Sequence, residues 1–245
     1  MFKVFYNSPD MYQMGTFKSL QIEAVQLQNV SFILDGLDPV LNHVDFELPM
    51  DQNVLIQSAN PNHGVQFLKI LAGYQKPQSG CIKWNEKDIF SDDVTDFVPH
   101  QMMGCYFENV RPHAQKTVTQ IFSEAGILPE QTRELLEQFD MSLMSEKKFS
   151  QLTYEVQKAI QLMTVISREP QMLILEDPAM GLSEFLFLEL LDLIHYGQRR
   201  GNLRHIYLTS HHPTALRHMD TSIMHLEDGL LFFEEKSDTK KLFNF

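Results

Sequence analysis

The sequence has few cysteines, no long apolar run and fewer basic than acidic residues. Two cysteines, Cys81 and Cys105, are too few for a disulfide framework, and their spacing does not match a zinc-ligand pattern. No stretch approaches the roughly 18 apolar residues of a transmembrane helix. The 20 lysines and arginines against 32 acidic residues leave a net charge of −12, which argues against a basic surface for nucleic acid. These absences favour a protein of a reducing, cytoplasmic compartment without a metal site.

The first 20 residues lack the basic start and apolar run of a secretory signal. They contain five aromatic residues: Phe2, Phe5, Tyr6, Tyr12 and Phe17. We expect residues 1–20 to form an extension that packs on the domain or on a partner, since disordered segments are poor in aromatics. Residues 21–245 fit one large α/β domain, and a hydrophobic content of 43% supports a substantial core.

The segment Ser58–Gln66 has the position of a phosphate-binding loop but lacks the residues that such a loop uses. It follows an apolar run over Asn53–Gln57, expected as a buried strand, and leads into a predicted helix from Val65 that ends at Gly73. A phosphate-binding loop needs glycines, a lysine for the β- and γ-phosphates, and a Ser or Thr hydroxyl for Mg²⁺. Counted backward from Gly73, the glycine positions hold Ser58, Pro61 and His63, the lysine position holds Gly64, and the hydroxyl positions hold Val65 and Gln66.

Each replacement removes a particular contact with nucleotide. Pro61 has no N–H to donate, and Val65 offers no oxygen to Mg²⁺. Lys69 does not replace the lost lysine, because it lies about 7.5 Å further along the helix axis. The candidate cofactor-contacting residues of this degenerate loop are Asn62, His63, Gly64, Val65 and Gln66, and we expect no bound cofactor.

Other landmarks follow in one order along the chain. They are two opening strands (26–32 and 39–48), the strand 76–85 that reads KPQSGCIKWN, a Q-loop place at Phe97–Gln101, a signature place at Leu152–Val156, a Walker B place at Arg168–Pro178, a D-loop place at Gly181–Ser183 and an H-loop place at Tyr207–His211. Their order and spacing over residues 24 to 233 resemble an ABC-transporter nucleotide-binding domain, although no single motif is intact.

The resemblance implies a P-loop NTPase-like ABC ATPase core of the α/β class, with an N-terminal antiparallel β-subdomain, a mostly parallel central sheet and a short helical subdomain. The residues agree with this division. Apolar residues recur at helical spacing over 118–125 and 130–139, so the helical subdomain is predicted at about 115–165. Strands and helices then alternate from Met172 to about Phe233, which is typical of a parallel sheet with crossovers.

The signature place departs from the LSGGQ sequence of the family. In the family, its serine and two glycines close on the γ-phosphate held by the opposite subunit. Here Thr153 keeps a hydroxyl, whereas Tyr154 and Glu155 replace the glycines. One interpretation is that a bulky ring and an anion reject a nucleotide at this face, since like charges about 4 Å apart repel. The other is an ordinary helix start capped by Thr153.

Three polar residues take the places of the family's catalytic groups. Glu176 and Asp177 stand in the reverse order of the family's Asp–Glu pair, which changes the reach of each carboxylate by one methylene group. Catalytic geometry tolerates errors of only about 0.5 Å. His211 takes the H-loop place, where the family's histidine contacts the γ-phosphate. These residues either retain a polar role or are remnants of a catalytic site without a present function, and the sequence leaves both alternatives open.

The resemblance also implies a contact with a transmembrane partner through the Q-loop region. Gln101, Met102, Met103, Tyr106 and Phe107 are the candidate partner-binding residues, because Met-rich and aromatic surfaces often mark adaptable binding sites. Core packing of the same residues is the alternative.

Together these features predict a catalytically inactive, pseudo-ATPase subunit with a structural or regulatory role in a membrane-associated, transporter-like complex. Its expected partners are a permease-like transmembrane subunit and a second copy of the chain or another ABC ATPase, at the inner face of the membrane. The alternative is a divergent but active ABC ATPase that binds ATP and Mg²⁺ and powers transport.

Overall fold

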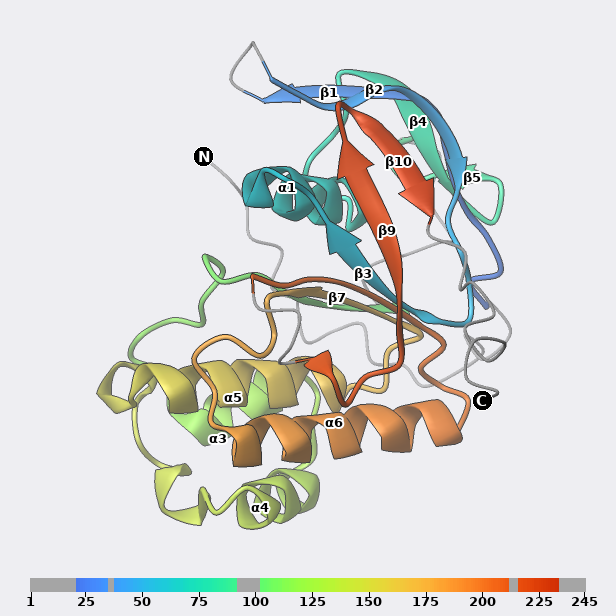
Figure 1. Ribbon diagram of the computed structural model, residues 1–245. Helices are drawn as coiled ribbons and strands as arrows, with labels where there is room; N and C mark the ends of the chain where they lie inside the picture. The colour runs from blue at the N-terminus through green and yellow to red at the C-terminus, as the bar shows by residue number, and fades with distance from the viewer. Residues whose placement is uncertain (1–20, 35–37, 92–101, 212–215, 234–245) are drawn as a thin grey trace, which may run out of the picture.

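Three layers make up the molecule. The computed structural model describes residues 21–34, 38–91, 102–211 and 216–233. Figure 1 shows an antiparallel sheet at the top, helices α3 to α6 at the bottom, and the central sheet with helix α1 between them. Among these residues, no helix has the length and apolar character needed to cross a lipid bilayer.

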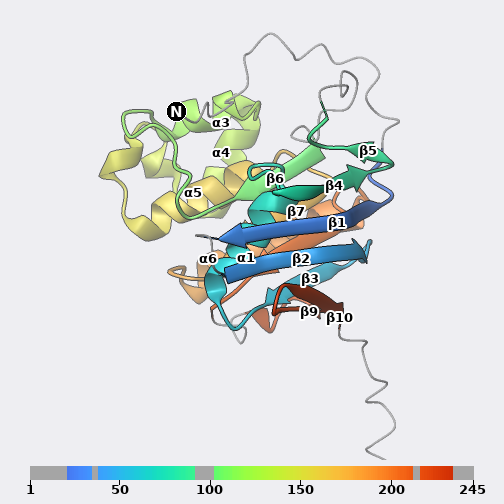
Figure 2. The same ribbon diagram turned by 90° about the horizontal axis from the view of Figure 1, so that it is seen from above.

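The antiparallel sheet has the strand order β2-β1-β4-β5. Its strands are β1 (Val25–Leu34), β2 (Asp38–Glu47), β4 (Ser79–Trp84) and β5 (Lys87–Asp88). Figure 2 shows them side by side from above. Strand β1 alternates between buried and more exposed residues along much of its length, as expected of a sheet with one buried face. In β2 the adjacent residues Val40 and Leu41 are both buried, where the pairing with β1 is irregular.

The central sheet has the order β10-β9-β3-β8-β7-β6, and only β10 runs antiparallel to its neighbour. Its strands are β3 (Asn53–Gln57), β6 (Met103–Tyr106), β7 (Met172–Glu176), β8 (His205–Thr209), β9 (Thr221–Glu227) and β10 (Leu230–Phe233). Strands β3, β7 and β8 each contain an unbroken run of buried residues, because layers cover both of their faces.

The helices occupy both sides of the central sheet. They are α1 (Pro61–Leu71), α3 (Val118–Glu124), α4 (Pro129–Gln138), α5 (Tyr154–Ile166) and α6 (Glu184–Arg199), with short 3₁₀ turns η3 (Ser142–Met144) and η4 (Phe149–Gln151). Helix α3 begins with a capping box in which the Thr117 side chain accepts from Gln120 N–H and the Gln120 side chain accepts from Thr117 N–H.

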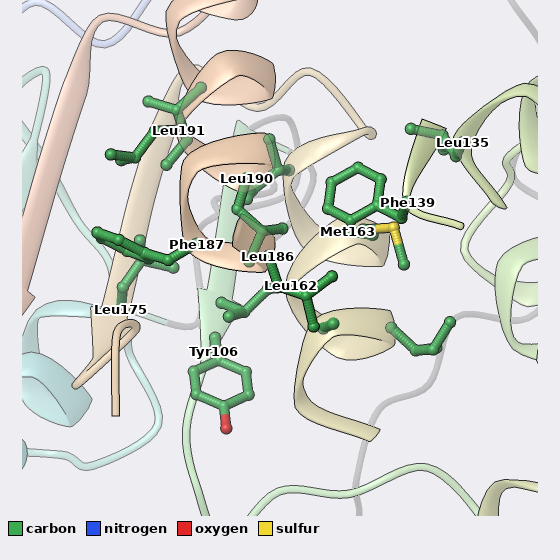
Figure 3. Close-up of a cluster of buried hydrophobic side chains, with 14 of the residues drawn as sticks. Tyr106, Leu135, Phe139, Leu162, Met163, Leu175, Leu186, Phe187, Leu190 and Leu191 are labelled. Atoms are coloured by element: carbon green, nitrogen blue, oxygen red, sulfur yellow. The ribbon is translucent and has the colours of Figure 1, made fainter. Parts of the chain in front are cut away.

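Two hydrophobic cores lie on opposite faces of the central sheet. Along β7, Leu173 and Leu175 belong to the core beneath helices α3 to α6, whereas Met172 and Ile174 belong to the core around α1. This alternation follows from the two-residue period of a strand. Figure 3 shows part of the first core, where side chains of α4, α5 and α6 meet β7.

The architecture confirms the predicted fold class: an antiparallel β-subdomain, a mostly parallel central sheet and a helical region. Helices α3 and α4 match the helical spacing predicted over 118–125 and 130–139. The assignment of 115–165 to a separate subdomain stays a prediction, as does the division at residue 20, because residues 1–20 lie outside the described part of the chain.

Candidate functional site

The site candidates from four strands meet at one edge of the central sheet. Strands β3, β8, β7 and β6 are parallel, so their carboxyl ends share this edge. The segments that leave this edge begin at Ser58 after β3, Ser210 after β8, Asp177 after β7 and Phe107 after β6. Ligands of open α/β sheets bind at such an edge.

Helix α1 begins earlier than the sequence predicts. Its first residue is Pro61, not Val65, so Asn62, His63 and Gly64 form its first turn. Asn60 caps this turn by accepting from the N–H of Asn62 (3.1 Å), and proline is favoured at a first helical position. The predicted start was wrong because this cap was not recognised. The predicted end is confirmed: α1 ends at Leu71, and Gly73 follows with a φ of 74°.

The chain itself supplies an anion beside the first turn of α1. One carboxylate oxygen of Asp38, at the start of β2, lies 2.9 Å from His63 Nε2 and accepts from the Asn60 amide at 3.3 Å. The N–H of His63 donates to the Asn60 carbonyl (2.9 Å). A negative charge near a helix N-terminus is favourable, so Asp38 provides there the kind of charge that a phosphate provides in a nucleotide site.

Gly64, at the place of the family's lysine, is closely packed. A β-carbon there would lie 2.9 Å from Cγ2 of Thr209 and 3.8 Å from Cγ2 of Ile56. Val65 is buried and Gln66 half-buried. The Lys69 ammonium lies 6.0 Å from the centre of the Phe107 ring, and its charge acts on Glu176.

Asp177 and His211 form a hydrogen-bonded pair. The Asp177 carboxylate is buried and lies 2.5 Å from His211 Nδ1. It also accepts from the His211 N–H and the Ser210 hydroxyl, both at 3.3 Å. Asp177 has a φ of 42°, a left-handed conformation uncommon for a non-glycine residue. The structure therefore brings these two sequence candidates together.

Glu176 faces a different set of groups. Its Oε2 accepts from the N–H of Glu108 at 3.1 Å. Burial raises the pKa of Glu176, and the charge of Lys69 and this hydrogen bond only partly oppose the rise. The two adjacent carboxylates thus point to separate partners, and Glu176 forms no hydrogen bond with Asp177.

The residues at the signature place form hydrogen bonds with other residues of the same chain. Thr153 caps α5 by accepting from Val156 N–H (3.5 Å), as in the interpretation of an ordinary helix start. The Tyr154 hydroxyl donates to Glu108 Oε2 (2.9 Å), and the Glu155 carboxylate accepts from Ser183 N–H (2.7 Å). The groups that replace the two glycines are therefore joined to neighbouring loops of the same protein.

The predicted partner-binding residues are mostly not at the surface. Met103, Tyr106 and Phe107 are 2–3% exposed, so the expectation that they are partly exposed was wrong and core packing holds for them. They are buried because β6 packs beneath α5 and beside β7. Met102 is half-buried, and Gln101 lies outside the described residues.

Sequence reasoning missed Glu108 and Lys158. Met103 pairs with Met172, so the start of β6 lies at the edge of the sheet opposite Glu176, whereas Glu108 follows the end of β6 and reaches the site. The Q-loop place assigned to Phe97–Gln101 lies outside the described residues, so this assignment stays a prediction. The available signal was a charged residue directly after an apolar run, at Glu108.

Comparison with known proteins points to one family. The family described as ABC transporter matches residues 41–180, more than half of the chain. The nickel import ATP-binding protein NikO of Rhodobacter capsulatus is 25% identical over 174 residues, which cover 65% of this chain and 67% of that protein. The Fe(3+) ions import ATP-binding protein FbpC of Escherichia coli O157:H7 is 22% identical over 211 residues, 82% of this chain and 58% of that protein.

Other relatives are longer. The match to an ABC transporter ATP-binding protein of Onion yellows phytoplasma (strain OY-M), 23% identical over 169 residues, covers 64% of this chain but 28% of that protein.

Solved structures agree in fold. An ATP-binding subunit of an ABC transporter superposes with a TM-score of 0.73 at 18% identity, covering 88% of this chain and 91% of that one. A dimeric bacterial ABC transporter cassette superposes with a TM-score of 0.69 at 16% identity, covering 86% and 98%. The family match and the shared architecture lead to one conclusion: the chain belongs to the ABC transporter family and has the fold of its ATP-binding cassette domains.

Proposed function

We propose that this protein is a catalytically inactive ABC-type subunit with a structural or regulatory role in a transporter-like complex. The observation that carries the proposal is the first turn of α1. The segment that would cradle phosphates is helical from Pro61, capped by Asn60 and bonded to Asp38. Its N–H groups at Asn62 and His63 already have partners within the chain, and no lysine or hydroxyl stands at the positions that bind phosphate and Mg²⁺.

The signature place supports the same proposal from the other half of a composite site. A family dimer holds each ATP between the loop of one chain and the signature of its partner. Tyr154 and Glu155 both bond within this chain, and they present a ring and a carboxylate where the family has glycines. A phosphate brought close to Glu155 would meet a like charge. The protein would then support no ATP site in a partner either.

The expected assembly follows from the family. Among the structural neighbours, one is a dimeric cassette and another is a metal-chelate type ABC transporter in an inward-facing conformation. By analogy, we place this subunit at the cytoplasmic face of a membrane, against a permease-like subunit and beside a second cassette.

One observation favours the alternative of a divergent, active ATPase. Asp177 and His211 form an acid–histidine pair at the carboxyl edge of the sheet, with Glu176 alongside. A buried carboxylate that orients an imidazole is an arrangement that general-base catalysis can use.

Calorimetric titration of the protein with ATP and Mg²⁺, together with an ATPase assay, separates the two proposals. The inactive subunit should show no binding below millimolar concentration, and hydrolysis no faster than a variant with Glu176→Ala and Asp177→Ala. Submillimolar binding, or hydrolysis well above that variant, would establish the alternative.

A further inference from the structure

A buried charged network joins α5 to the edge of the central sheet. Lys158, in the second turn of α5, is 1% exposed. Its ammonium donates to the Glu108 carboxylate and to the Asp177 carbonyl (2.8 Å). It also lies 5.2 Å from the centre of the Tyr106 ring, within cation–π range. Lys158 therefore bonds to the residues that follow two neighbouring strands, Glu108 after β6 and Asp177 after β7.

Glu108 is the centre of this network. Its carboxylate accepts from Lys158, from the Tyr106 hydroxyl (2.9 Å) and from the Tyr154 hydroxyl (2.9 Å), and its N–H donates to Glu176. Burial alone would raise the pKa of Glu108, but these donors together hold it below its ordinary value. Figure 3 shows the Tyr106 ring against the apolar core with its hydroxyl directed away from it.

Two further contacts attach the turn that follows β7. The Tyr154 ring lies against Gly181, so closely that a β-carbon at 181 would stand 2.5 Å from Cε1. Glu155 accepts from the N–H of Ser183, the residue that caps α6. The first turn of α5 thus contacts both the residue after β6 and the turn before α6.

We propose that these contacts form a lock, made of Glu108, Tyr154, Glu155 and Lys158, that holds α5 and the turn 178–183 in one orientation on the central sheet without a nucleotide. Apolar packing alone does not select a single orientation as strictly, because it is non-directional, whereas a carboxylate with several donors at hydrogen-bonding distance is directional. The lock goes beyond the proposed function, since it requires neither the presence nor the absence of hydrolysis.

Amide hydrogen exchange of the full chain, free of nucleotide, tests the lock. In Tyr154→Phe only one hydroxyl is lost, so the variant should fold. We expect exchange in residues 154–160 and 178–183 to become at least about tenfold faster, the size expected for the loss of a hydrogen bond to a charged acceptor. Strands β1 and β2 should exchange as in the unchanged protein.

Tyr196→Phe is the matched control. The Tyr196 hydroxyl on α6 bonds only to Arg200 among the described contacts (3.4 Å), so its loss should leave both segments unchanged. A second variant, Glu108→Gln, removes the central charge. Because Lys158 and the Tyr106 hydroxyl also donate to Glu108, this variant should accelerate exchange more than Tyr154→Phe does. Adding Tyr154→Phe to Glu108→Gln should then have a smaller effect than Tyr154→Phe has in the unchanged protein, because both changes affect the contact between these two residues.

Two results would overturn the proposal. One is unchanged exchange in both segments of Tyr154→Phe. The other is an equal acceleration in β1 and β2, which would show a general loss of stability. Because no nucleotide is added, a negative result in this exchange experiment would overturn the lock without deciding the proposed function, which the ATP titration tests.

Discussion

The ring of Tyr154 packs directly on Gly181, 27 positions further along the chain, and the glycine has a φ of 72°. A side chain at 181 would therefore meet two penalties: a left-handed backbone and an overlap with the tyrosine ring. Tyr154, which replaces a signature glycine, thus packs against a glycine in the turn between β7 and α6.

We expect Gly181→Ala to lower the free energy of unfolding by about 2–4 kcal/mol, the sum of a positive-φ penalty and overpacking. Gly201→Ala is the control, because Gly201 has a φ of 73° but no atom within 4 Å of the added carbon. The free energy of unfolding of Gly201→Ala should be lower by only about 1 kcal/mol. Urea unfolding measures both variants. Equal losses would show that contact with Tyr154 does not matter.

Gly64→Lys restores the missing lysine in sequence but should not restore nucleotide binding. The added β-carbon would lie 2.9 Å from Thr209 Cγ2, and the first turn of α1 would still be closed by Asn60. We expect a loss of about 1–3 kcal/mol in stability and no submillimolar ATP binding by calorimetry. Adding Thr209→Ser, which removes Cγ2, should recover part of the stability. Tight ATP binding by Gly64→Lys alone would contradict the account of this loop.

The two neighbouring carboxylates should differ in their importance to the fold. Asp177→Asn loses the charge that holds His211 Nδ1 and should cost about 1.5–3 kcal/mol. Glu176→Gln keeps an oxygen for the Glu108 N–H and removes a charge that burial disfavours, so stability should change by no more than about 0.5 kcal/mol. Thermal unfolding of both variants at pH 7 compares their losses of stability. A larger loss in Glu176→Gln than in Asp177→Asn would contradict the prediction.

His205 should make stability depend on pH. It is fully buried, accepts from Asp51 N–H (2.8 Å) at Nδ1, and lies 3.2 Å from the Ile22 carbonyl at Nε2. Burial lowers its pKa below the ordinary value of 6.5. The unfolded chain then binds the proton more readily, so the stability contribution is complete above about pH 6.5 and falls as pH decreases, by at most about 1.4 kcal/mol per unit.

Unfolding in urea at about pH 7.5 and pH 5.5 measures this dependence. In His205→Gln the difference between the two values should shrink relative to the unchanged protein. His218→Gln, which changes a half-exposed histidine 4.0 Å from Glu184, is the control and should keep the difference. A difference that survives in His205→Gln would assign the pH dependence to other groups.

Most of the fold could be predicted from local patterns. The short apolar runs at 53–57 and 172–176 are β3 and β7, and the helical spacing near 118 and 130 is α3 and α4. The burial of Met103 and Tyr106 could not be predicted, because a strand of four residues is too short for its periodicity to show which neighbours cover it.

The candidate site was predicted less well than the fold. Asp177 and His211 were named from sequence and lie together, whereas Glu108 and Lys158 were missed. Glu108 bonds to Lys158 and Tyr154, which lie 50 and 46 positions further along the chain, and no local pattern links residues at such separations.

The amino-acid sequence is enough to show which chemical groups stand at each motif place: no lysine at 64, no hydroxyl at 65, and a tyrosine and a glutamate at 154 and 155. These are matters of residue identity and need no fold. Which partners those groups bond to became known from the folded chain. It closed the first turn of α1 with Asn60 and Asp38, and it turned Tyr154 and Glu155 toward Glu108 and Ser183. The physical reason is that hydrogen bonds and close packing act over a few ångströms in space, between residues that only the folded chain brings together.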